Sequence, residues 1–468
     1  GNITKDGITR DLEAMKANGI AGYQLFEAGS GIPIGPVESL SDEWVDLILH
    51  TLKESERLGL EFAMHNCPGW SSSGGPWITP DKAMQIITWS ETKITGGKQV
   101  RIQLPTPKHM FDYYIDTYCL AIPANMKVIP RLSILELSNR LDKDGVLTWD
   151  VPTGEWLIMR FGQTAKDQKN KSAPSKSTGL DCDKFSTEAL DYHLNCMFKR
   201  LMPTMEKIAK HSKIGLLIDS YETGDQDWTS DMPAYFEQSH GYELYPFLPV
   251  LANKIVESEE STKRFLFDFR RVRADMFAER YYGHFQKRCK EKGIITYTEP
   301  YGGNMMEELQ VAQQLDINMG EFWCGQTVLW ANYKYNRTVK QVASIAHTLG
   351  GKVVGAEAFT SEPDADKWLQ YPYALKSLGD YMFTRGLSRI YFHRFAHQPH
   401  PTAAPGMTMG AWGLHFDRTN TWWKPGKAWI EYLNRCQYIF QSSTFYGDIL
   451  YHNGDDSFGS TIEPERTL

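Results

Sequence analysis

Four glutamates lie at or just beyond the ends of short apolar segments of the sequence. They are Glu222, Glu299, Glu321 and Glu357. Glycoside hydrolysis needs one carboxylic acid to protonate the leaving oxygen and a second carboxylate to activate water or attack the sugar. A single glutamate in such a place is usually a solvated loop residue. Four on one rim would repel one another unless protons, cations or a ligand compensated, so the set predicts a functional cluster.

Aromatic and polar side chains accompany these glutamates. The neighbours are His65, Asn66, Trp70, Tyr221 and Trp323. Aromatic residues make up 13% of the chain, and flat aromatic faces pack against the C–H faces of sugars. The composition therefore suits a carbohydrate-handling protein, although a large aromatic core would explain it equally well.

Three histidines follow another apolar segment near residue 390. His393, His397 and His400 lie at a strand end that runs into a proline-rich loop, a spacing that does not match a helical zinc motif. We expect His393 to hydrogen-bond sugar hydroxyls and His400 to be structural.

Composition excludes several classes of protein. The net charge is −7 and no half of the chain is strongly basic, which argues against a nucleic-acid partner. No apolar run approaches the roughly 20 residues of a membrane span. The seven cysteines contain no CxxC pair, so a structural zinc site is not expected. The chain opens without a signal peptide and reads as part of a longer protein.

Helical and strand-like segments alternate along most of the chain, which is typical of a parallel sheet covered by helices. Seven strands are predicted to begin near residues 20, 60, 214, 294, 318, 353 and 389. The pattern predicts an α/β fold, a (β/α)8 TIM-like barrel whose active site lies at the C-terminal strand ends. Such a barrel has eight strands. The eighth is expected either at 156–161 or before Gly1.

The alternation breaks between about residues 92 and 161. Period-two runs at 100–104 and 147–151 predict an inserted antiparallel β unit there. The expected organisation is therefore a first part of the barrel at 1–91, the β unit at 92–161 and the rest of the barrel at 162–445. Residues 446–468 would be a tail or the start of a further β-domain. A helix over 186–210 should divide near Pro203.

Several motifs resemble glycoside hydrolase family 106, the α-L-rhamnosidases. The longest is HNCPGWSSSGGPW at residues 65–77. Shorter matches are GITRDL at 7–12, GIAG at 19–22, WDVP at 149–152, RFG at 160–162, GLDCDK at 179–184, DSYE at 219–222 and AEAFT at 356–360. They span nearly the whole chain.

The resemblance implies a bacterial enzyme, often from Bacteroidetes, that is exported to the periplasm or secreted. Such enzymes release terminal α-L-rhamnosyl units from plant pectic glycans with inversion, and calcium is associated with their active site. The expected partner is a rhamnose-containing oligosaccharide or polysaccharide, and calcium is the expected cofactor.

Residue roles follow from the matched motifs. The resemblance implies that Glu222 is the general acid and Glu357 the general base, with Glu321 either a calcium ligand or an alternative base. Glu299 joins the substrate site with His65, Asn66, Trp70, Tyr221, Trp323 and His393. The rhamnose methyl group is expected to meet an apolar side chain, with Phe322 and Phe359 as candidates. Two alternatives stay open, namely a non-catalytic sugar-binding barrel and a retaining glycosidase for another sugar.

Overall fold

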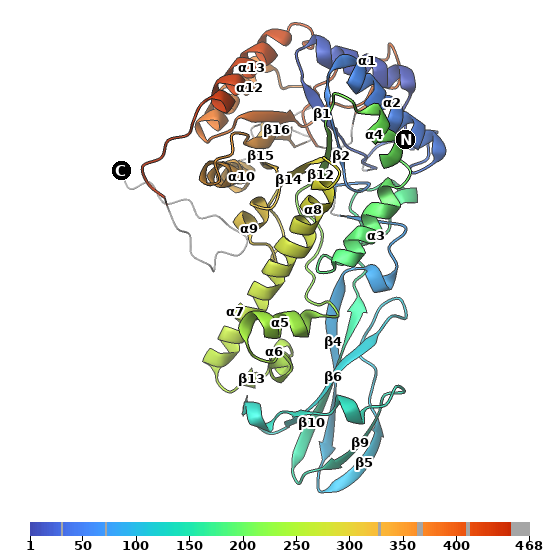
Figure 1. The fold of residues 1–468 in the computed structure, drawn as a ribbon, viewed down its shortest axis with the longest axis vertical. Helices are drawn as coiled ribbons and strands as arrows, with labels where there is room; N and C mark the ends of the chain where they lie inside the picture. The colour runs from blue at the N-terminus through green and yellow to red at the C-terminus, as the bar shows by residue number, and fades with distance from the viewer. Residues whose placement is uncertain (30, 71–72, 326–328, 363–367, 409–411, 451–468) are drawn as a thin grey trace.

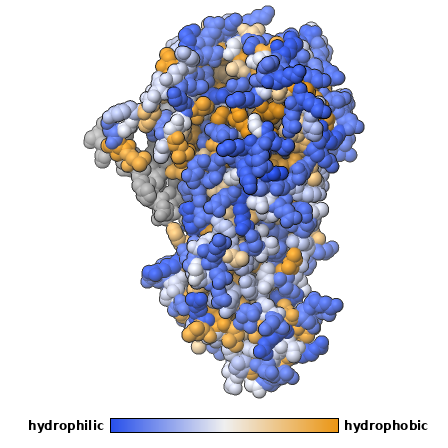
Figure 2. Space-filling model, viewed as in Figure 1, coloured by the Kyte–Doolittle hydropathy of each residue, from blue (hydrophilic) through white to orange (hydrophobic). Residues whose placement is uncertain are grey.

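The computed structural model describes residues 1–29, 31–70, 73–325, 329–362, 368–408 and 412–450. The molecule is elongated, with an α/β barrel at one end and an antiparallel β unit at the other (Figure 1). Most of the predicted tail at 446–468 lies outside the described residues, as do Ser71 and Ser72 of the long motif. The face seen in Figure 2 is mostly hydrophilic, with apolar patches over the barrel and over the far end of the β unit.

Seven parallel strands form the wall of the barrel. In spatial order they are β1 (Gly22–Leu25), β2 (Glu61–His65), β12 (Ile214–Ile218), β14 (Ile295–Thr298), β15 (Ile317–Cys324), β16 (Gly355–Ser361) and β17 (Arg389–Phe392). All seven predicted strands are confirmed, and each pairs in parallel with the next. Because β12 and β15 are wholly buried, their sequences are largely apolar.

Helices cover the outside of this sheet (Figure 1). They are α1 (Lys5–Ala17), α2 (Asp42–Leu58), α3 (Thr187–Phe198), α4 (Met202–Ile208), α8 (His284–Lys290), α9 (Glu308–Ala312), α10 (Leu329–Thr348), α12 (Pro372–Thr384) and α13 (Lys427–Ser442). In α2 the Ser41 side chain caps the first turn, and Gly59 ends the helix in a left-handed conformation. The predicted break near Pro203 is confirmed, because that proline lies in the first turn of α4.

The antiparallel unit is built mainly from two long strands that leave and re-enter the barrel. Its four-stranded sheet has the order β4 (Gln85–Thr95), β10 (Glu155–Ala165), β6 (Ile115–Pro123) and β8 (Leu135–Glu136). A smaller sheet pairs β5 (Lys98–Gln103) with β9 (Val146–Val151). Residues 156–161 lie in β10, so the prediction that they supply a barrel strand is wrong. Their unbroken apolar run arises because both faces of β10 are buried.

A helical extension of the barrel chain packs beside this unit. It comprises α5 (Met232–His240), α6 (Leu248–Leu251) and α7 (Glu259–Met276). Here β13 (Ile255–Val256) pairs with β7 (Val128–Ile129) of the unit. Further short pairing joins β3 (Gly74–Gly75) to β11 (Leu180–Asp181) at the barrel rim. One continuous apolar core runs through barrel and unit, so the two ends of the molecule are held together.

The barrel wall is open between its first and last strands. Within the described residues, β1 pairs only with β2 and β17 only with β16. Every residue of these two strands is half-buried, unlike the strands between them. A cavity of about 460 Å³ lies along the opening, lined by both strands and by α1, α2 and α13, and continues to the C-terminal strand ends.

Candidate active site

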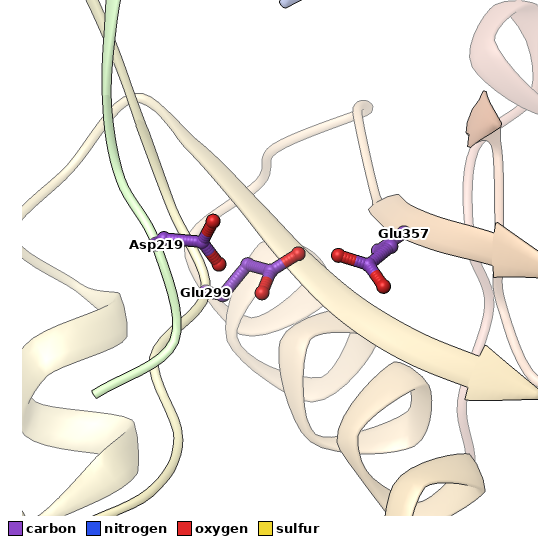
Figure 3. A group of neighbouring side chains, drawn as sticks. All are labelled: Asp219, Glu299 and Glu357. Atoms are coloured by element: carbon purple, nitrogen blue, oxygen red, sulfur yellow. The ribbon is translucent and has the colours of Figure 1, made fainter. Parts of the chain in front are cut away.

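Three carboxyl groups meet at the C-terminal ends of the barrel strands. Asp219 follows β12, Glu299 follows β14, and Glu357 lies within β16. An oxygen from each carboxyl group lies within 4.8 Å of the others. Figure 3 shows the three side chains reaching toward one region from separate segments. Parallel strands bring these groups together because their carboxyl ends share one edge of the sheet.

Burial makes ionisation of this centre unfavourable. It raises the pKa of Asp219 and raises that of Glu299 well above its ordinary value, where the charges of Asp219 and Glu357 add to the effect. It also raises the pKa of Glu357 to about 7, against an opposing hydrogen bond from Thr360. The Tyr301 hydroxyl donates to Glu299 over 2.7 Å. Three carboxyl groups in such surroundings hold a proton or need a cation.

Two histidines flank the carboxyl centre, and both line the cavity. The Nε2 atom of His65 lies 3.6 Å from the Asp219 carboxylate, and the Nδ1 atom of His393 lies 3.7 Å from that of Glu357. Burial lowers the pKa of His65 and lowers that of His393 to about 3. Both imidazoles are therefore neutral at pH 7, as hydrogen-bonding partners for sugar hydroxyls should be.

Glu321 lies beside the centre on β15 and is buried. Its carboxylate accepts a hydrogen bond from the Trp323 indole. Burial raises its pKa well above the ordinary value, and the charge of Glu357 adds to this. Within the described residues, the group of ligating atoms inside 4.8 Å does not include Glu321. It therefore stands next to the three-carboxyl centre, as a neighbour of Glu357.

Glu222 occupies the rim, and its side chain is 39% exposed. Its carboxylate accepts hydrogen bonds from the Trp70 indole over 2.9 Å and from Lys171 Nζ over 2.6 Å. The charge of Glu222 helps to raise the pKa of Glu357, so the two carboxyl groups lie close enough to interact.

Other predicted sugar contacts have internal partners. Asn66 is buried, donates to the Leu217 carbonyl over 2.9 Å and accepts from Ser73. Tyr221 is also buried and donates to the Gly224 carbonyl over 2.9 Å. These side chains hold the rim loops in place, and the structure gives no support to their predicted role in sugar binding.

Alternation on β15 turns Phe322 away from the side of Glu321, whereas on β16 the positive φ of Phe359 and a register shift interrupt the alternation two residues after Glu357. Both are fully buried in an outer apolar cluster and neither lines the cavity, so neither receives a sugar methyl group. Sequence reasoning omitted Asp219 from the site. Its signal was present, because an aspartate directly after a buried strand is placed at the same edge as the glutamates.

The family model of glycoside hydrolase family 106, described as alpha-L-rhamnosidase, matches residues 1–117 and 107–467. The chain belongs to this family. The resemblance seen in its motifs is therefore confirmed, and the carboxyl centre is that of a family 106 protein.

Two known proteins are similar to this family 106 chain. A putative beta-glucuronidase of Formosa agariphila is 40% identical over 488 residues, which cover 98% of this chain and 41% of that protein. The structure of a rhamnosidase from Novosphingobium sp. PP1Y superposes with a TM-score of 0.86 at 23% identity, over 94% of this chain and 58% of that one. The second likeness establishes the fold. The chain spans about 41% and 58% of the lengths of these relatives.

The family 106 centre fits a hard divalent cation such as calcium. Calcium prefers carboxylate oxygens, and Asp219, Glu299 and Glu357 offer three in one small buried volume. Burial is the main cause of their raised pKa values, and a bound cation would favour the ionised forms. Asp219 and Glu299 would hold such an ion, which would supply a Lewis-acidic anchor for sugar hydroxyls.

We expect calcium to stabilise the protein more at pH 8 than at pH 5. Without a cation, the folded centre keeps protons that the unfolded chain releases above about pH 4, so stability falls as pH rises toward 7. Calcium in large excess over its Kd should raise Tm by about 3 °C or more at pH 8, measured by calorimetry against EDTA.

The matched variants for this measurement are Glu299→Gln and Glu260→Gln. Glu299→Gln should abolish the calcium response and should raise Tm in EDTA at pH 8, because it removes a buried group whose ionisation is unfavourable. Glu260 is on the surface, paired with Arg264, and its variant should respond as the wild type does. An equal calcium response in the wild type and Glu299→Gln would contradict a cation at this centre.

Proposed function

We propose that the protein is an inverting exo-α-L-rhamnosidase that releases terminal α-L-rhamnosyl units from plant pectic glycans. The supporting observation is the convergence of carboxyl groups at the strand ends of a family 106 barrel. We further propose that it acts in the periplasm or outside the cell on rhamnose-containing oligosaccharides or polysaccharides. The described residues contain no helix with the length and apolarity needed to cross a bilayer.

Glu222 and Glu357 take the acid and base roles in this proposal. Glu222 lies at the open rim, where a leaving group can depart, and protonates the glycosidic oxygen. Glu357 takes a proton from a water molecule on the opposite face of the sugar. The Thr360 hydroxyl and the nearby His393 ring orient the Glu357 carboxylate. An inverting enzyme leaves about 6.5–9.5 Å between these carboxyl groups so that the water fits, whereas about 5–5.5 Å would favour retention.

The pH profile should report the buried base. Glu357 has a pKa of about 7 and must be ionised to accept a proton. In EDTA, kcat/KM should therefore fall about tenfold for each pH unit below 7. Calcium should move this limb to lower pH, since a nearby positive charge favours the carboxylate. If the acidic limb lies at the same pH with and without calcium, the prediction that a cation binds close to Glu357 is contradicted.

A second candidate is a glycosidase for another sugar, because the similar protein of Formosa agariphila is described as a putative beta-glucuronidase. Purified protein should be offered an aryl α-L-rhamnoside and an aryl β-D-glucuronide in parallel. Release from the rhamnoside, with β-L-rhamnose as the first product anomer by NMR, supports the proposal. Turnover of the glucuronide alone, or α-L-rhamnose as the first product, would contradict it. Calorimetric binding of rhamnose without turnover would identify a non-catalytic sugar-binding barrel.

A further inference from the structure

The motif segment 179–184 contains an ion pair that is completely withdrawn from solvent. Lys184 and Asp181 both have side-chain exposures of 0%, and their charged atoms lie 3.4 Å apart. Burial raises the pKa of Asp181, and the charge of Lys184 opposes this rise. Burial lowers the pKa of Lys184, but the charges of its neighbours, Asp181 first among them, outweigh burial and leave the pKa raised. Buried ion pairs often contribute little to stability compared with apolar side chains of similar volume. We therefore examine whether this pair holds neighbouring loops in position.

Residues of this segment form hydrogen bonds with the loop that carries Glu222. The Thr223 hydroxyl donates to Asp181 over 2.8 Å, immediately after Glu222 in the chain. Farther along, Gln226 accepts from the Lys184 backbone amide over 3.0 Å, and Thr229 donates to Asp183 over 2.7 Å. The loop is therefore anchored at every third residue, beginning beside the rim glutamate.

The segment also forms a hydrogen bond with the loop that carries Trp70. The Lys184 ammonium group donates to the Ser73 carbonyl over 3.5 Å and lies over the Tyr281 ring. Ser73 also bonds to Asn66 and to the Tyr281 hydroxyl through its own hydroxyl group. Lys184 and Asp181 thus lie between two rim loops.

A hydrogen bond joins the two loops at the rim. It runs from the Trp70 indole to the Glu222 carboxylate over 2.9 Å. Each partner of that bond lies within three residues of a group held by the buried pair, namely Ser73 and Thr223. A shift of the pair would therefore move the Glu222 carboxyl group relative to a bound substrate.

We propose that Asp181 and Lys184 are positioning residues that fix the Glu222 carboxyl group against the leaving oxygen through Thr223 and Ser73. The inference rests on the proposed function, in which Glu222 is the general acid. It gives a role to the motif at residues 179–184, which contains none of the proposed catalytic residues. Misplacement by about 1 Å can reduce a rate about 100-fold, so loosening one anchor should be visible in kinetics.

The test compares two substrates whose leaving groups differ in their need for a proton. Phenyl α-L-rhamnoside requires the acid, whereas 2,4-dinitrophenyl α-L-rhamnoside leaves readily without it. In the complete protein, Thr223→Val replaces the hydroxyl that bonds to Asp181 with a methyl group. It should lower kcat/KM for the phenyl substrate by about 10–100-fold and leave the dinitrophenyl substrate nearly unchanged. Thr223→Ser keeps the hydroxyl and should restore the wild-type ratio.

Thr229→Val is the matched control, because it removes an equivalent bond at the far end of the same loop. It should lower thermal stability without changing the ratio of the two substrates. If Thr223→Val does not fold, Asp181→Asn takes its place and should show the same selective loss. Suppose that the wild type is active and that Thr223→Val or Asp181→Asn folds but keeps the wild-type ratio of kcat/KM for the two substrates. That result would overturn this inference and leave the proposed function intact. A wild type inactive on both rhamnosides would overturn the proposed function as well.

Discussion

Glu357→Gln should lower kcat/KM for an aryl α-L-rhamnoside by about 10²–10⁴-fold, the usual contribution of a general base. The amide keeps the size of the side chain and its bond to Thr360 but cannot accept a proton from water. Both rhamnosides of the leaving-group pair should be affected, because water attack is needed for each. Initial rates at pH 8, where Glu357 of the wild type is ionised, give the measurement.

Glu362→Gln serves as the control for this variant, since it changes a glutamate five residues farther along that has no place at the carboxyl centre. It should keep wild-type rates. Near-wild-type activity in Glu357→Gln would remove this residue from the role of base and leave Glu321, its buried neighbour, as the remaining candidate.

Glu222→Gln should produce a loss that depends on the leaving group. For phenyl α-L-rhamnoside we expect about 10²–10⁴-fold lower kcat/KM, because the departing phenoxide receives no proton. For the dinitrophenyl substrate the loss should be small.

Glu243→Gln is a suitable control, because it neutralises an exposed glutamate beyond the same rim loop. Its kinetics should match the wild type with both substrates. Equal losses of both substrates in Glu222→Gln would exclude a role limited to leaving-group protonation.

The barrel could be predicted from the sequence because its strands and helices carry strong local signals. The seven strands are short apolar runs bounded by helices, and Ser41, Gly59 and Pro203 mark helix ends through capping and backbone restriction. Residues 156–161 were ambiguous for a physical reason. A strand buried on both faces looks the same in sequence whether it lies in a barrel or in an antiparallel sheet.

The site was predictable at the level of strand ends and less so at the level of side-chain partners. Glu299 and Glu357 lie where the barrel rule places them. Asp219 obeys the same rule and was nevertheless passed over. The internal bonds of Asn66 and Tyr221 depend on which loops pack beneath the rim, and no local pattern in the sequence encodes that packing.

The opening between β1 and β17 determines how many further strands the described sheet can accept. A strand edge without a partner is a template for another chain, and on a flat sheet each added strand exposes a fresh edge, so growth continues. Within the described residues, the unpaired edges of β1 and β17 border one cavity. A single strand placed between them could bond to both, and a wall completed in this way would offer no further edge for pairing.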